Sequence, residues 1–288
     1  MTERHLDAAV RHDFVLLFDV TDGNPNGDPD AGNLPRVDPE TMEGMVTDVC
    51  LKRKVRDYVA TQKQGQTGYN IYVEHKGILY NQQEKAYKAL AIASSKDQTK
   101  AREARGWMCE NFFDVRAFGA VMSTTEFNCG QVRGPMQLTF ARSLDPVVPM
   151  DLSITRVAVT RADADHETEM GRKTLLPYGL YRGYGFYNPY LAQETGFTDE
   201  DLGVFWEALE RMWDLDRSAA RGLMACRALA VFSHGSALGN APAHKLFDLV
   251  KVRKRDSVGA PRHFSDYEIT LDRDRVPANV TTSVLVEW

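Results

Sequence analysis

Runs of apolar residues along the chain predict a mixture of strands and helices rather than a regular alternation of the two. Residues 14–20 (Phe-Val-Leu-Leu-Phe-Asp-Val) form a short, β-rich apolar run, which predicts a buried strand. Residues 199–213 carry apolar side chains at helical spacing after Thr198, a suitable N-cap, and predict a helix. Helices are also expected at residues 42–62 and within 83–108, and strands at 113–121, in two segments between 135 and 161, at 176–190 and at 222–232. This order is typical of an α+β fold, compatible with a ferredoxin-like core that carries long insertions.

The composition is that of an ordinary globular chain and leaves several classes of protein without support. Of the 288 residues, 43% are hydrophobic and 26% are charged. No apolar run approaches the ~18 residues of a membrane-spanning helix, and the first residues hold no export signal. The four cysteines are scattered without a C-x-x-C pair, which predicts reduced thiols and no metal site. We therefore expect a cytoplasmic protein with no bound metal or cofactor and no contact with a membrane.

Charge is unevenly distributed, and this matters more than the formal net charge of −5. A net negative charge argues against nucleic-acid binding. However, residues 51–56 (Leu-Lys-Arg-Lys-Val-Arg) hold four positive charges, and residues 251–255 (Lys-Val-Arg-Lys-Arg) hold another four. Such runs could bind a polyanion, solvate a helix face, or pair with acidic patches on other copies of the chain. Charge alone decides none of these.

The segment at residues 22–32 is rich in Asp, Asn and Gly and is predicted to be a loop. It begins like a calcium-binding EF-hand loop, but Asn33 stands where a glutamate ligand is required. Three aspartates in or after it, Asp28, Asp30 and Asp38, could serve metal-assisted phosphodiester cleavage. A solvated acidic loop is the interpretation we favour, and backbone N–H groups that meet phosphates are a third possibility.

Two further segments have features of nucleic-acid contacts. Residues 182–189 are close to the first ribonucleoprotein motif of RRM domains, whose aromatic side chains stack on bases. The match ends at Pro189, so we expect the aromatic side chains to pack inside the protein and at interfaces: Tyr178, Tyr181, Tyr184, Phe186 and Tyr187. Residues 233–242 form a small-residue loop whose amides and hydroxyls suit a phosphate contact. No nucleophile accompanies His234, so a catalytic base is not expected there.

Five motifs together resemble one known family. In chain order they are Asn24-Pro-Asn-Gly-Asp28, Leu51-Lys-Arg-x-x-Arg56, Asp114-Val-Arg-Ala-Phe-Gly119, Gly134-Pro-Met-Gln-Leu138 with Ala141-Arg-Ser143, and the loop at 233–242. Their order and spacing resemble the backbone subunit of type I CRISPR Cascade complexes, in the RAMP superfamily, and within it the subtype I-C branch. The resemblance runs nearly from end to end of the chain.

The resemblance implies a single hand-shaped domain over residues 1–288. A modified RRM palm would use the strands near 14–20, 113–121, 177–187 and 223–232. A finger insertion would cover residues 64–111, and a thumb hairpin residues 144–176. Copies would assemble along the spacer part of a guide RNA (crRNA) and present it for pairing with the target DNA strand. The implied partners are crRNA, the target DNA strand, adjacent copies, and other Cascade subunits: the guide-end-binding RAMP subunit, the large subunit and the small subunit.

Roles for individual residues follow from the same resemblance. It implies a passive scaffold with no catalytic residue, and these RNA-binding residues: Asn24, Asn26, Thr47, Lys52, Arg53, Arg56, Arg116, Ser233, His234, Ser236 and Asn240. The apolar wedge of the thumb would include Met150, Ile154 and Val157. Type III relatives use an aspartate in the loop after the first strand to cut RNA. A metal-dependent RNA endonuclease subunit is therefore the alternative, and a homo-oligomer without nucleic acid is the third reading.

Overall fold

An antiparallel sheet forms the centre of the molecule. The structure is a computed structural model, which describes residues 3–92, 98–158 and 169–288. Strand β1 (His12–Gly23) pairs along its whole length with β10 (Glu169–Tyr187) on one side and β11 (Leu223–His234) on the other. The order continues outward to β14 (Val280–Val286) beside β11, and to β8 (Ala141–Pro146), β7 (Met136–Leu138) and β4 (Glu43–Val46) beyond β10. The predicted α+β class is confirmed.

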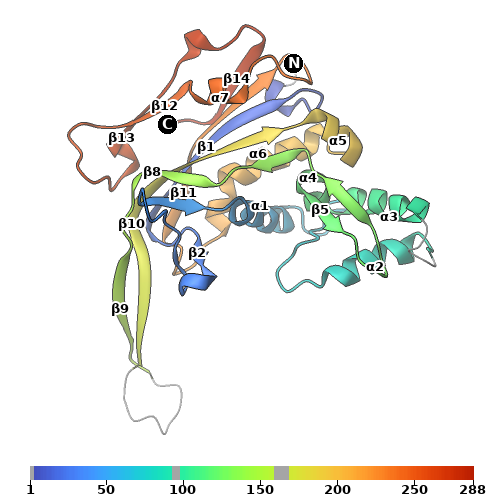
Figure 1. Ribbon diagram of the computed structural model, residues 1–288, viewed down its shortest axis with the longest axis horizontal. Helices are drawn as coiled ribbons and strands as arrows, with labels where there is room; N and C mark the ends of the chain where they lie inside the picture. The colour runs from blue at the N-terminus through green and yellow to red at the C-terminus, as the bar shows by residue number, and fades with distance from the viewer. Residues whose placement is uncertain (1–2, 93–97, 159–168) are drawn as a thin grey trace.

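Both faces of this sheet are covered, which explains why residues 14–20 are apolar without alternation. Phe14, Leu16 and Phe18 point to the face packed by helices α1 (Asp48–Gln62) and α6 (Asp199–Leu215). Val15 and Leu17 point to the opposite face, where α7 (Ala243–Phe247) and the hairpin of β12 (Val250–Lys254) and β13 (Tyr267–Leu271) lie (Figure 1). The strand predicted from this run is confirmed.

The two helices on the first face begin at well-defined caps. Thr198 starts α6 with a reciprocal capping box to Asp201, as expected from the sequence. Helix α1 begins six residues later than predicted, because residues 43–46 form the short edge strand β4 against β8. Its N-cap is Thr47, whose hydroxyl accepts the N–H of Cys50.

The strand expected at residues 113–121 is wrong. Residues Phe113–Phe118 form helix α4, and the short β5 (Gly119–Met122) pairs with β6 (Gly130–Arg133) outside the central sheet. All six residues of α4 are buried. The positions of its apolar side chains are therefore compatible with a buried strand as well as with a helix. Ion pairs of Asp114 with Arg56 on α1 and of Arg116 with Asp201 on α6 favour the helix, and the central sheet receives no strand from this segment.

A second small core lies beside the sheet. Helices α2 (Leu79–Ala89) and α3 (Gln98–Asn111) pack around buried Tyr72, Tyr87 and Met108 (Figure 1). The helical region predicted within 83–108 is confirmed in the described residues, and residues 93–97 lie outside them. Between α1 and α2, Asn70 forms an isolated bridge with Phe112.

A two-stranded hairpin projects from the sheet. Strand β9 (Met150–Arg156) pairs with the first part of β10, from Leu175 to Glu169, beyond the sheet's edge (Figure 1). The remaining elements are short: β2 (Gly27–Asp28), β3 (Leu34–Pro35), α5 (Pro189–Thr195) and the 3-10 helices Arg4–Leu6, Pro29–Ala31, Phe264–Asp266 and Arg273–Arg275. Within the described ranges, no helix has the length and apolar character needed to cross a bilayer.

His12, buried at the start of β1, makes the stability of the fold depend on pH. Burial lowers the pKa of its ring to about 4, against an ordinary value of 6.5. The unfolded chain therefore binds a proton here at a pH where the folded chain does not. Stability present above pH 6.5 is lost as the pH falls toward 4, by about 3 kcal/mol in total. Urea unfolding at pH 7 and pH 4.5 measures this slope. His12→Asn should flatten it, whereas the exposed His244→Asn should leave it unchanged; equal slopes in both variants would contradict the assignment.

Candidate nucleic-acid interface

A groove of about 700 Å³ opens where β1 ends and α1 begins. The loop after β1 is fastened to the helix by Asn26, whose side-chain oxygen accepts the backbone N–H of Thr47 at 2.9 Å and its hydroxyl at 3.0 Å. Asn24 secures the other end of the loop by donating to the carbonyl of Asn33 at 2.7 Å. The side chains of Asn24, Asn26 and Thr47 therefore shape the groove. The side-chain oxygens of Asn26 and Thr47 are engaged, whereas the buried Oδ1 of Asn24 has no hydrogen-bond partner within the described chain.

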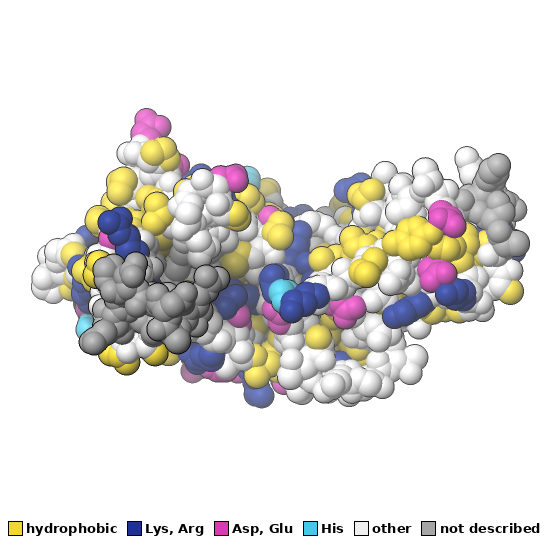
Figure 2. Space-filling model, turned by 90° about the horizontal axis from the view of Figure 1, so that it is seen from below, with side chains coloured by type: hydrophobic (Ala, Val, Ile, Leu, Met, Phe, Trp, Pro, Cys, Tyr) yellow, Lys and Arg dark blue, Asp and Glu magenta, His cyan; other side chains and the backbone are white. Residues whose placement is uncertain are grey.

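Three arginines from separate parts of the chain line this groove. Arg53 on α1 has a side chain 55% exposed and lies 3.5 Å from Asp57, while Arg36 pairs with Asp28 and Arg221 with Asp216. The exposed Arg53–Asp57 pair contributes little to stability, so a phosphate can replace that carboxylate at small cost. The pairs of Arg36 and Arg221 are partly buried. Exposed Val49 and Phe140 lie beside the arginines and offer apolar contact to a base or sugar. Figure 2 shows Lys and Arg side chains gathered in the hollow between the two masses of the molecule.

The predicted basic residues on α1 differ in how accessible the fold leaves them. Of the predicted cations, only Arg53 is well exposed. Lys52 pairs with Asp48 and Arg56 with Asp114, and both cationic groups lie over the ring of Phe118. Their side chains are 14% and 11% exposed, so only a small part of each is accessible to a ligand.

The second predicted cluster lies at the opposite end of the sheet. Ser233 pairs with His12 at the start of β1, whereas Asn24 follows the end of that strand. A strand of this length spans about 35 Å, so within one copy the loop at 235–242 and the groove are separate surfaces. Ser233 and His234 are also buried, at 1% and 0% exposure. The expectation that their side chains contact RNA is therefore not met by this structure, while Ser236 and Asn240 do reach the surface.

The loop after β11 presents backbone donors. The side chain of Asn240 accepts the N–H of Gly235 at 2.7 Å, and Gly239 donates to the carbonyl of Ser236. Within the described chain, the N–H groups of residues 236–238 make no hydrogen bond. Three consecutive backbone donors beside a hydroxyl are suited to phosphate oxygens.

Arg116 was predicted to bind RNA and is instead structural. Its side chain is 7% exposed and donates to both carboxylate oxygens of Asp201, at 2.9 and 2.6 Å. It also donates to the carbonyl oxygens of Gly68 and Cys109. With its donors directed inward, this guanidinium joins α4 to α6 and is closed to a ligand.

The acidic side chains near the groove are also engaged. Asp28 pairs with Arg36, and Asp38 accepts the N–H groups of Glu40 and Thr41 and pairs with Arg142. The N–H of Glu40 and the guanidinium of Arg142 lower the pKa of Asp38. Among the residues that the structure describes, no three His, Cys, Asp or Glu side chains are arranged to hold a metal ion.

The aromatic residues near the ribonucleoprotein-like motif pack as expected. Tyr181 and Tyr187 are buried on the face of the central sheet that α1 and α6 cover, and Tyr178 is buried on the face that α7 covers. Tyr184 and Phe186 lie 4.5 and 5.7 Å from the ring of Phe247 on α7. This face of β10 is therefore covered by α7 and is not a base-stacking platform.

Sequence comparison places these features within a known family. The profile of a family described as CRISPR-associated protein Cas7 matches residues 10–272, which include the groove, the hairpin and the loop after β11. The chain belongs to the Cas7 family. The family-level prediction from the five motifs is thus confirmed.

Several proteins with low sequence identity are similar to this Cas7-family chain. A CRISPR-associated protein Cas7 of Haloferax volcanii is 26% identical over 226 residues, which are 69% of this chain and 64% of the relative. The aligned part thus spans less than two thirds of that relative's length. A chain of a CRISPR RNA-guided surveillance complex in a pre-nicking state is 13% identical, with a TM-score of 0.49 and 78% of each chain covered. A chain of another CRISPR RNA-guided surveillance complex is 16% identical, with a TM-score of 0.48, 78% of this chain covered and 69% of that one.

The exposed apolar surface of the Cas7-family chain includes its hairpin. Met150, Leu152 and Ile154 alternate along β9 and point to one face, and each is more than a third exposed. Val157 follows at 87% exposure. Leu152 was missed from the sequence, although the period of two that it shares with Met150 and Ile154 was the signal that could have found it.

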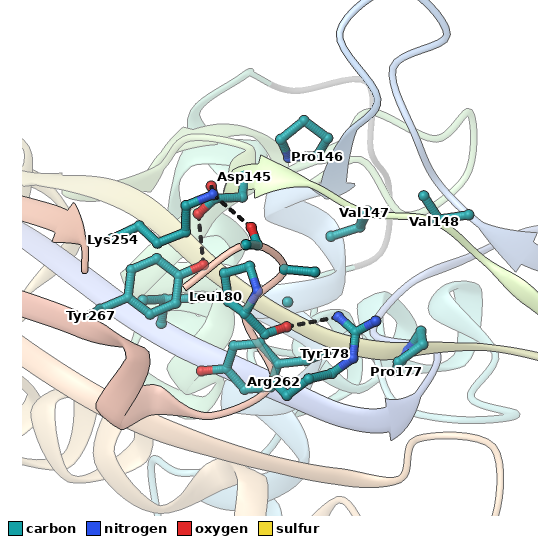
Figure 3. A pocket seen from close by; sticks show the side chains of 14 residues that line it. Asp145, Pro146, Val147, Val148, Pro177, Tyr178, Leu180, Lys254, Arg262 and Tyr267 are labelled. Atoms are coloured by element: carbon teal, nitrogen blue, oxygen red, sulfur yellow. Dashed lines mark hydrogen bonds and ion pairs between the residues drawn. The ribbon is translucent and has the colours of Figure 1, made fainter. Parts of the chain in front are cut away.

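A second cavity, of about 300 Å³, lies at the base of this hairpin, and contacts around it hold the hairpin in place (Figure 3). The carboxylate of Asp145 accepts the hydroxyl of Tyr267 at 2.7 Å and pairs with Lys254 at 3.1 Å. Pro146, Pro177 and Pro261 are among the other residues that line this cavity. These contacts join the hairpin to the β12–β13 unit and so hold its direction.

Three groove residues of the Cas7-family chain were also missed: Arg36, Phe140 and Arg221. Arg36 and Arg221 come from parts of the sequence that are far from the basic run at 51–56. Phe140 lies directly before the Ala141-Arg-Ser143 motif, which was a usable signal. Only the antiparallel pairing of β1 with β11 brings Arg221 next to the loop after β1.

Proposed function

We propose that this chain is a non-catalytic, guide-RNA-binding backbone subunit of a CRISPR surveillance complex of subtype I-C. The observation that carries the proposal is the groove at the start of α1, where Arg36, Arg53 and Arg221 surround a pre-shaped loop. The Cas7 family match and the order of the five motifs support it. The partners would be crRNA, the target DNA strand, adjacent copies and the other Cascade subunits.

The chemistry of the groove suits any RNA sequence. Guanidinium groups and backbone amides bind phosphate and sugar oxygens, which carry no sequence information directly. A scaffold that must accept every guide needs this property, and base pairing then reads the sequence. A few arginines per copy are sufficient when many copies bind one strand, because their contacts add along it.

The three parts of the molecule correspond to a hand. The central sheet would be the modified RRM palm, the α2–α3 unit within residues 64–111 the finger insertion, and the hairpin within residues 144–176 the thumb. A two-stranded ribbon with exposed apolar side chains is marginally stable alone in water. A contact with the next copy or with displaced bases would cover that surface.

The ion pairs of Asp28 and Asp38 support a non-catalytic function rather than an endonuclease activity. One oxygen of each carboxylate is paired with an arginine, that of Asp28 with Arg36 and that of Asp38 with Arg142, whereas a metal ion would need carboxylate oxygens that are free to bind it. Incubating the guide-loaded protein with labelled complementary RNA and magnesium tests this directly. Intact target is expected, and regularly spaced cuts that vanish in an Asp28→Asn variant would establish the endonuclease.

Charge reversal in the groove should weaken RNA binding without unfolding the chain. Arg53→Glu replaces an exposed cation, so we expect about tenfold weaker binding to single-stranded RNA and a salt slope smaller by about 0.7. Fluorescence anisotropy with a labelled oligouridine at several salt concentrations measures both quantities.

The matched control is Arg211→Glu on α6. The Arg211 side chain is 59% exposed and forms a similar intrahelical pair, but it does not line the groove. Equal losses in the two variants would mean that net charge, rather than the groove, determines affinity.

A further inference from the structure

His234 is buried beneath the loop at residues 235–240, in a network of charged and polar groups. Its Nε2 lies 2.9 Å from the carboxylate of Asp13, which is also bound by Arg11 at 2.9 Å. Its Nδ1 accepts the backbone N–H of Asn240 at 2.8 Å. The nitrogen that accepts carries no proton, so the ring is held as the tautomer that donates from Nε2 to Asp13.

The same network supports the loop at both ends. The backbone N–H of His234 donates to the carbonyl of Arg11, and the N–H of Arg11 lies 3.4 Å from the carbonyl of Ser236. The loop closes over the Arg11 side chain at Gly239, whose φ of 94° favours glycine. A Cβ added at Gly239 would stand 2.7 Å from the guanidinium. The conformation of the loop therefore depends on its contacts with the network beneath it.

We infer that Arg11, Asp13 and His234 are positioning residues that preset this loop for phosphate. His234 acts through the N–H of Asn240, and it does not touch RNA. With Asn240 fixed in this way, the three consecutive N–H groups of residues 236–238 make no hydrogen bond within the described chain, and Ser236 adds a hydroxyl to the same loop. The ligand is a phosphodiester group, and this role rests on the proposed RNA-binding function.

Two substitutions at His234 distinguish the roles of its two ring nitrogens. In His234→Asn, the side-chain oxygen lies where Nδ1 lay, so the acceptor for the N–H of Asn240 is kept. In His234→Gln, the amide nitrogen can reach the position of Nε2, so the bond to Asp13 is kept and the acceptor is lost. Asp13 retains Arg11 in both variants.

Hydrogen exchange of residues 235–240 and affinity for labelled oligouridine are measured on the full chain. We expect faster exchange of the Asn240 amide and about fivefold weaker binding in His234→Gln, and near wild-type values of both in His234→Asn. Equal loss of affinity in the two variants would indicate direct RNA contact, and unchanged loop exchange in His234→Gln would indicate no positioning role; either overturns the inference. Because exchange is measured without RNA, it remains decisive even if the wild-type chain does not bind RNA, which would refute the proposed function alone.

Discussion

Replacing Arg116 with methionine is expected to lower the free energy of unfolding by about 4 kcal/mol. The substitution removes both hydrogen bonds to the buried carboxylate of Asp201 and leaves that charge without its cation. Urea unfolding followed by circular dichroism measures the loss. Adding Asp201→Asn to the variant should recover part of it, because the amide no longer buries an unpaired charge while it can still cap α6.

The same variant distinguishes a structural role for Arg116 from a role in RNA binding. At a temperature where Arg116→Met remains folded, its affinity for RNA should equal that of the wild-type chain, since the guanidinium is closed to ligands. A loss of stability below about 1 kcal/mol, together with weaker RNA binding, would restore the assignment that the motif Asp114-Val-Arg-Ala-Phe-Gly119 suggested.

Placing acidic side chains on the apolar face of the hairpin is expected to prevent assembly of copies along RNA. In the double variant Leu152→Asp with Ile154→Asp, each contact with the next copy or its RNA should weaken by about thirtyfold or more. Both side chains are already exposed in the single chain, so its stability should change by about 0.5 kcal/mol or less. Native mass spectrometry of the protein with a guide RNA counts the copies per strand.

The control lies on the same strand. Ser153 points to the opposite face of β9 from Leu152 and Ile154, so Ser153→Asp adds charge to the hairpin without altering the apolar face. Assembly should survive in Ser153→Asp and fail in the double variant. Equal numbers of copies on the guide in both would show that the apolar face makes no contact between copies.

Elements defined by their own residues could be predicted from the sequence. The run at 14–20 required no partner to be recognised as a strand, and Thr198 marked the start of α6. Residues 113–118 fitted two periods, and the decision between them depends on Arg56 and Asp201, which are distant in the chain. The helix predicted at 42–62 is present, but its start was placed six residues too early for a similar reason, because β4 exists only through its pairing with β8.

The site was predictable in its motifs but not in the orientation of its side chains. Arg53, Ser236 and Asn240 reach the surface as expected, whereas Arg116, Ser233 and His234 are buried within the same motifs. The sequence alone does not show whether the partner of a basic or polar residue is a phosphate or a buried carboxylate. Only the positions of Asp201 and Asp13 in the fold separate the two cases.

The most direct test of the central claim is co-expression of the chain with a CRISPR array and the partner subunits, followed by purification and sequencing of the bound RNA. The account predicts a defined guide RNA with several copies of the chain on it, and loss of that RNA when Arg36, Arg53 and Arg221 are all changed to Glu. A purified assembly that lacks RNA, or one that keeps its guide undiminished in the triple variant, would contradict the account.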